Sequence, residues 1–150
     1  MIDFTIERDI DRSPDDVFAF IADPDKLAEW QTNTVSAEVE GGGPVGLGTR
    51  IREVHRAPGG KEWEQLVEIS EWEPGRRFGV HIVEGQMPID GLITLEPGGS
   101  GTRFAFRVFG QPTGGARLMQ PLLRVVLKRS FGQFCDTLKQ RLEASPAPAR

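Results

Sequence analysis

Between about residue 34 and residue 110 the chain reads as six β-strands in succession, and this run constrains the fold more than any other feature. Apolar and polar residues alternate within it, and the connections are short and contain glycine. Because no helical segment separates the strands, we expect each to pair antiparallel with the next, as a meander. The expected strands are residues 34–40, 49–57, 61–72, 78–85, 87–96 and 102–110.

The segment before the meander supplies one more strand and two short helices. Apolar residues alternate from Ile2 to Ile10, which is the period of a half-buried strand. Ser13, followed by a proline and two aspartates, is typical of a helix start. Pro24 ends this helix and starts a second one, which closes at Trp30.

The segment after the meander is a long amphipathic helix. From about residue 115 to residue 143, apolar residues recur at three- and four-residue steps, with Pro121 either early in the helix or at a kink. Residues 117–141 hold six basic residues and one acid, although the whole chain has a net charge of −4. We interpret this as a solvated helix face opposite an acidic N-terminal segment, and a surface for anionic lipid is the alternative.

These elements predict an α+β fold, in which a strongly curved, seven-stranded antiparallel sheet wraps around the C-terminal helix. A chain of 150 residues fits one domain, which we place at residues 1–144, with residues 145–150 as a disordered tail. Cys135 is the only cysteine, no apolar run is long enough to span a bilayer, and the N-terminus does not read as a signal peptide. We therefore expect a cytoplasmic protein without an internal disulfide.

A sheet with this curvature cannot be filled by one helix, so we expect a cavity between them. A three-residue loop at residues 58–60 would place Glu53 opposite Gln65 and His55 opposite Trp63, all four facing the cavity. A two-residue loop would shift the register and turn Glu53 and His55 outward.

Polar groups in an apolar cavity need partners, because an unpaired buried carboxylate costs several kcal/mol. We interpret Glu53, His55 and Gln65 as groups that orient the polar end of a ligand; the alternative places them at a solvated rim of the sheet. Trp30 either borders the cavity or belongs to the core. The other residues expected to line the cavity are Trp63, Val80, Ile89, Phe104, Phe106, Leu118, Met119, Leu122 and Leu123.

Few features indicate catalysis. His55 and His81 lie on different strands and by parity face opposite ways, so we expect no metal site and no cofactor. Cys135 reads as a buried, unreactive thiol, and no nucleophile elbow is present. The remaining enzymatic alternative is general acid–base catalysis by Glu53 and His55 in the cavity.

Five short motifs occur in order along the chain: "SPDDVFAFIADPDKLAEWQ", "GGGPVGLGTRIREV", "ISEWEPGRRF", "EPGGSGTRFAF" and "LKQRLE". Together, over about residues 2–143, they resemble the SRPBCC superfamily, the helix-grip proteins related to START lipid-binding domains, the birch-pollen allergen and polyketide cyclase/dehydrase proteins. The resemblance implies a helix-grip fold around a cavity for a small hydrophobic ligand, in proteins that are mostly bacterial and cytoplasmic. The superfamily that the chain resembles also includes cyclases, whose pockets hold many polar residues. This chain departs from that pattern, because it has no tyrosine.

The function that we expect is therefore the binding or transport of a small hydrophobic or amphipathic molecule, lipid-like or polyketide-like. The alternatives are a cyclase, dehydrase or hydrolase that uses Glu53 and His55, and a cochaperone-like interaction module. The expected partner is the small molecule, with no nucleic acid, no stable membrane insertion and, at most, a weak homodimer.

Overall fold

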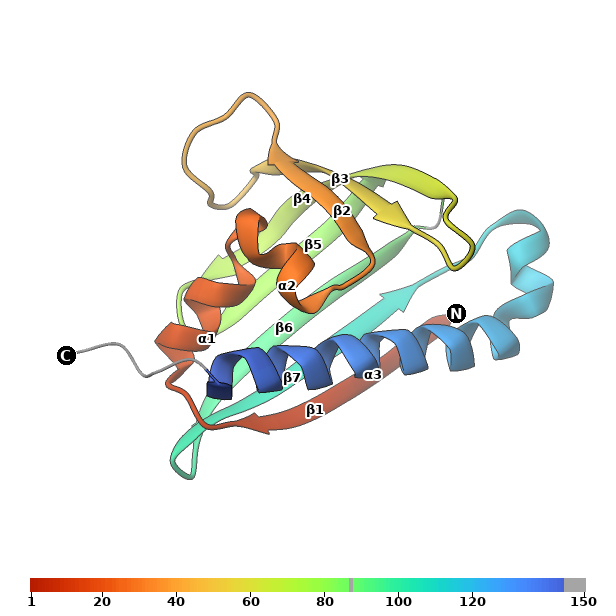
Figure 1. Ribbon diagram of the computed structural model, residues 1–150. Helices are drawn as coiled ribbons and strands as arrows, with labels where there is room; N and C mark the ends of the chain where they lie inside the picture. Colours follow the sequence, from red (N-terminus) through yellow and green to blue (C-terminus); the bar gives the residue numbers. More distant parts are fainter. Residues whose placement is uncertain (87, 145–150) are drawn as a thin grey trace.

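The computed structural model describes residues 1–86 and 88–144, and it has the α+β architecture expected from the sequence (Figure 1). The first half of the chain contains strand β1, a group of short helices and strands β2 to β4. The second half contains strands β5 to β7, a 3₁₀-helix and the long helix α3. The elements are β1 (Ile2–Ile10), α1 (Pro14–Ile21), η1 (Pro24–Lys26), α2 (Leu27–Trp30), β2 (Thr34–Val39), β3 (Arg50–Arg56), β4 (Glu62–Glu73), β5 (Arg77–Glu84), β6 (Ile89–Gly98), β7 (Gly101–Gly110), η2 (Gly114–Met119) and α3 (Gln120–Ala144).

The seven strands form one antiparallel sheet in the order β1-β7-β6-β5-β4-β3-β2. The meander is therefore confirmed, and β1 joins it by pairing with the last strand over the whole of Ile2–Ile10. Helix α3 runs along β1, and α1 and α2 lie on the same side of the sheet (Figure 1). This is the helix-grip arrangement.

Helix α1 begins as its sequence predicts. The Ser13 side chain accepts a hydrogen bond from the backbone N–H of Asp16 at 3.2 Å, which satisfies one of the free donors at the helix start. Val17, Phe18 and Ile21 are its buried residues. Helix α1 is therefore capped and amphipathic. It connects the edge strand β1 to α2, which borders the cavity described below.

The long C-terminal helix differs from its prediction at its start. Residues 114–119 form the separate 3₁₀-helix η2, and α3 begins at Gln120. Pro121 lies in the first turn of α3, where its missing N–H has no helical partner to lose. The expected tail at residues 145–150 lies outside the described residues, and the extent of the domain stays a prediction.

Helix α3 is buried only along its C-terminal half. Cys135, Leu138 and Leu142 are buried against the core, whereas Leu122 and Val125 are more than half exposed. The N-terminus of the chain lies beside the start of α3, where the Met1 ammonium group donates to Gln120 Oε1 at 2.6 Å (Figure 1). The sheet therefore grips the second half of the helix, and in the first half only one face is partly buried, through Leu123 and Leu127.

Candidate functional site

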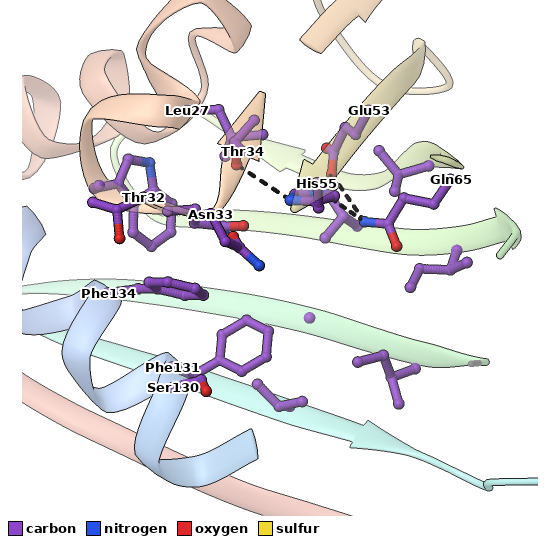
Figure 2. Close-up of a pocket in the computed structure, with 18 of the residues that line it drawn as sticks. Leu27, Thr32, Asn33, Thr34, Glu53, His55, Gln65, Ser130, Phe131 and Phe134 are labelled. Carbon is purple, nitrogen blue, oxygen red and sulfur yellow. Dashed lines mark hydrogen bonds and ion pairs between the residues drawn. The ribbon is translucent and has the colours of Figure 1, made fainter. Parts of the chain in front are cut away.

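A cavity of about 900 Å³ lies between the sheet, the segment around α2 and the middle of α3. Its wall combines apolar side chains with a small group of polar ones, which is typical of small-molecule sites. Figure 2 shows Phe131 and Phe134 of α3 on one side and the polar residues of β2, β3 and β4 on the other. The expected space between sheet and helix is therefore present.

The hairpin between β3 and β4 has the register that places polar side chains in this cavity. Glu53 pairs with Gln65 and His55 pairs with Trp63, and the Ala57 N–H donates to the Lys61 carbonyl across a three-residue loop. Glu53 is 8% exposed and His55 is 4% exposed, so neither lies at a solvated rim. The inward orientation of this pair is what the three-residue loop predicts.

The polar residues form one hydrogen-bonded cluster, which we call the Glu53 cluster: Thr34, Glu53, His55 and Gln65. His55 Nε2 lies 2.8 Å from Glu53 Oε1, and Gln65 Nε2 donates to the same oxygen at 2.9 Å (Figure 2). Thr34 Oγ1 lies 3.3 Å from His55 Nδ1. With an ionised Glu53, which only accepts, the hydrogen bond would require the proton on His55 Nε2, and His55 Nδ1 would then be the acceptor for the Thr34 hydroxyl.

The His55 ring of the cluster is held by stacking, and one oxygen of Glu53 has no hydrogen bond within the described part of the chain. The His55 ring stacks on Trp63 with centroids 5.4 Å apart and planes inclined by 25°. Among the described residues, no hydrogen bond uses Glu53 Oε2, although Oε1 accepts two. The buried side-chain atoms without a partner among the described residues are Trp30 Nε1, Asn33 Oδ1 and Arg77 Nε, so Glu53 Oε2 is accessible, and a donor from a ligand or water in the cavity would pair with it.

The opposite wall is aromatic. Phe131 contacts Phe106 edge-on with centroids 5.3 Å apart, and it contacts Phe134 at 5.6 Å. Trp30 is 1% exposed and packs 6.1 Å from Phe106, so it belongs both to the core and to the cavity wall. Such edge-to-face aromatic packing gives the cavity a rigid apolar surface.

The structure brings most of the expected cavity residues together. Trp30, Glu53, His55, Trp63, Gln65, Val80, Ile89 and Phe106 all line the cavity.

Five of the expected residues are placed elsewhere. Phe104 is fully buried in the core, and Leu123 packs partly buried against it. Leu118, Met119 and Leu122 are 87%, 52% and 57% exposed, which corrects their expected place in the cavity wall. The reason is that η2 and the first turns of α3 extend beyond the cavity, so the helix lines it from Leu127 onward.

Some lining residues are not predicted by the sequence. Asn33 and Thr34 enter the wall because the segment after α2 passes over the cavity, and Ser130 faces it from α3 (Figure 2). Phe131 and Phe134 belong to the apolar stripe of the helix, and the helical period alone does not distinguish core from cavity wall. For Asn33 and Thr34 the sequence carries no signal.

The described residues give little support to a metal site, a reactive cysteine or a membrane-spanning helix. Among residues 1–86 and 88–144, no three His, Cys, Asp or Glu side chains are grouped as a metal site would require. Burial raises the pKa of the Cys135 thiol to about 12, so it is protonated at neutral pH. Within the same residues, no helix has the length and apolar character needed to cross a bilayer.

Solved structures with the same fold include proteins of several kinds. TTHA0849 from Thermus thermophilus is 25% identical, with a TM-score of 0.79 over 95% of this chain and 97% of that chain. The protein Ara h 8.0201 is 17% identical, with a TM-score of 0.72 over 95% of this chain and 98% of that chain. The di-domain ARO/CYC protein StfQ of the steffimycin biosynthetic pathway is 15% identical, with a TM-score of 0.78 over 95% of this chain and 50% of that chain.

No curated protein matches the chain by sequence. A family model does match it, over residues 1–143, and that family is described as "Polyketide cyclase / dehydrase and lipid transport". The match spans all of the strands and nearly all of α3, in agreement with the helix-grip fold and the SRPBCC resemblance. The chain belongs to the polyketide cyclase / dehydrase and lipid transport family.

Proposed function

We propose that the chain binds a small hydrophobic or amphipathic molecule in the cavity between the sheet and α3. The observation that carries this proposal is a cavity of about 900 Å³ whose mostly apolar wall holds one buried, hydrogen-bonded polar cluster. A cavity near the upper end of the usual range for ligand sites accommodates a lipid-like or polyketide-like molecule. Membership of a family that includes lipid transport supports the same function.

The Glu53 cluster suggests which end of the ligand it would hold. Glu53 Oε2 is an acceptor, and a ligand carboxylate beside it would meet a like charge in a region of low dielectric constant. A hydroxyl or amine hydrogen would instead find an acceptor there. We therefore propose a ligand with an apolar body and a neutral or cationic hydrogen-bond donor at one end.

Binding is tested with the neutral fluorescent probe N-phenyl-1-naphthylamine and with solvent extraction of the purified protein followed by mass spectrometry. We expect saturable probe binding, and we expect Ser130→Trp to weaken it, because Ser130 faces the cavity and an indole there would occupy part of it beside Phe131 and Phe134. The matched control is Gln140→Trp, at an exposed position of the same helix outside the cavity wall. Equal binding by the two variants would contradict the proposal.

A second candidate function is acid–base catalysis, which is favoured by the 2.8 Å contact between His55 Nε2 and Glu53 Oε1 inside the cavity. In dehydration, Glu53 Oε2 would take the proton next to the ketone while the β-hydroxyl leaves as water with a proton from solvent. In ester hydrolysis, it would take a proton from the attacking water while p-nitrophenolate leaves. In both reactions, the His55 contact would hold the carboxylate in place. The test is the hydrolysis of p-nitrophenyl butyrate and the dehydration of β-hydroxyketones, in the wild type and in Glu53→Gln. A rate that Glu53→Gln abolishes while probe binding persists would favour the enzyme over the carrier.

The single cysteine and its burial support a reducing, cytoplasmic setting for either function.

A further inference from the structure

An exposed apolar surface covers η2 and the first half of α3. It consists of Leu118, Met119, Leu122, Val125 and Val126, which are between 51% and 87% exposed. We call it the η2–α3 surface. Single exposed apolar residues are ordinary in proteins, but five within nine consecutive residues form a patch, and such patches mark interaction sites.

The charged residues of this segment are all positive. Arg117, Arg124, Lys128 and Arg129 lie in the same segment and are exposed. The pKa of the Asp3 carboxyl on β1 is lowered by its hydrogen bond from Arg107 and also by Arg124, which is near enough to contribute. No acidic residue occurs from position 97 to position 135, although the chain as a whole has a net charge of −4. The one strongly basic region of an acidic sequence therefore coincides with these exposed leucines and valines.

We propose that the η2–α3 surface docks reversibly on an anionic phospholipid bilayer. Exposed Leu and Val side chains would enter the boundary between headgroups and acyl chains, and the four cations would contact lipid phosphates. The negative charge on the rest of the molecule is repelled by such a bilayer, so the protein would approach it with this surface first.

Charge distinguishes the bilayer from the other occupants of such a surface. In a twofold dimer the surface would face its own copy, and four cations on each side would repel one another. Nucleic acid would neutralise the cations but would leave Leu118 and Val125 in water. An anionic bilayer satisfies both the apolar and the basic side chains.

The docking surface lies next to the cavity along α3. Leu127 and Ser130 line the cavity, and Val126 on the same turn belongs to the η2–α3 surface. A protein docked through this surface would hold that end of the cavity near the membrane. Docking itself does not depend on the cavity having a ligand, so the two proposals can fail separately.

The experiment is co-sedimentation of the full chain with vesicles of phosphatidylcholine alone and of phosphatidylcholine mixed equally with phosphatidylglycerol. We expect binding to the mixed vesicles only, and weaker binding as salt is raised. Lys128→Gln should lower the partition coefficient about fivefold, since each cation near an anionic membrane contributes roughly that factor. The matched control Arg103→Gln, whose side chain is 66% exposed on β7, should bind as the wild type does.

The apolar part is tested by Leu122→Glu against Leu47→Glu, a leucine that is 69% exposed in the loop between β2 and β3. Leu122→Glu should lose vesicle binding at least tenfold and Leu47→Glu should retain it; circular dichroism checks that both variants fold. Equal binding to both vesicle types, or equal binding by the two variants, would overturn the proposal. So would a wild-type dimer in sedimentation velocity that Leu122→Glu converts to monomer.

Discussion

At the scale of single residues, the Glu53 cluster is a group of hydrogen-bonded polar side chains in a mostly apolar interior. Glu53 Oε1 accepts from Gln65 Nε2 and lies 2.8 Å from His55 Nε2, so the three side chains depend on one shared oxygen. Removing one partner from such a cluster costs more than the cluster contributes, because the remaining polar groups stay buried without partners. Single substitutions in the cluster should therefore lower the stability of the fold more than a joint replacement of its polar side chains by apolar ones.

We predict that Glu53→Leu lowers the free energy of unfolding by about 1–3 kcal/mol, because it leaves two buried donors without an acceptor. The triple variant Glu53→Leu, His55→Phe, Gln65→Leu should recover part of that loss, since no donor then remains unpaired. Urea denaturation measures both. Glu64→Leu, at an exposed position of β4, is the control, and a triple variant less stable than Glu53→Leu would contradict the prediction.

Cys135 provides a second prediction at this scale. Burial raises the pKa of its thiol to about 12, so very little thiolate exists near neutral pH. We expect no reaction of the native protein with Ellman's reagent on the time scale of mixing, and one equivalent of thiol after unfolding in guanidinium chloride. Rapid labelling of the folded protein would show that Cys135 is accessible after all.

At the scale of elements, the end of α3 is fastened to the loop between β1 and α1. Glu143 Oε2 accepts from the Asp11 N–H at 3.0 Å and from Lys139 Nζ at 2.8 Å. Arg12 donates to the Glu143 carbonyl at 3.0 Å. These contacts join two segments far apart in sequence and hold α3 across the sheet at the end opposite to the η2–α3 surface.

This contact predicts a pH dependence. The hydrogen bond from Lys139, followed by the Asp11 N–H, holds the pKa of Glu143 below its usual value. A depressed carboxyl pKa adds stability above the unfolded-state pKa, and that stability is lost as pH falls through the lowered folded-state value. The unfolding free energy of Glu143→Gln should therefore fall less between neutral and acid pH than that of the wild type.

The effect of Glu143→Gln should be small, because the Glu143 and Lys139 side chains are 31% and 40% exposed and solvent screens their interaction. Urea denaturation at several pH values measures it, with Glu96→Gln at an exposed position of β6 as the control. Parallel curves of stability against pH for Glu143→Gln and the wild type would show that the contact contributes nothing.

At the scale of the whole molecule, the cavity is the consequence of one helix inside a curved sheet. The buried apolar residues of α3 lie in its C-terminal half. The part of the sheet that this half does not cover faces only α1, α2 and the segment after α2. The side chains that line a cavity of this size lack the packing contacts that a filled core would give them. A guest that restores those contacts should therefore stabilise the fold.

We predict that N-phenyl-1-naphthylamine raises the melting temperature in a concentration-dependent way. At a free concentration one hundred times its Kd, a ligand that binds only the folded state adds about 2.7 kcal/mol. Differential scanning calorimetry should show this shift for the wild type and for Gln140→Trp, and a smaller shift for Ser130→Trp. A melting temperature that does not depend on the probe would mean that the cavity does not take it up.

The sequence by itself determined the order of the strands and main helices and the antiparallel meander, and it limited the register of the β3–β4 hairpin to two alternatives. These depend on local chemistry: alternation, helical period, caps and turn residues act over a few neighbouring positions. Glu53 and His55 faced inward in only one of these alternatives, and the structure decided between them by the length of the loop, which sets the orientation of the strand before it.

Only the tertiary structure decided where along α3 the cavity ends. Leu123 and Leu127 lie four residues apart on one face of α3, and both pack against the core, yet only Leu127 lines the cavity. The difference depends on how far the sheet extends beneath each turn of the helix, and on the segment at Asn33 and Thr34 that covers the cavity from above. Such long-range contacts leave no trace in the local pattern, because an apolar helix face has the same spacing whether it meets a sheet, a guest or a membrane.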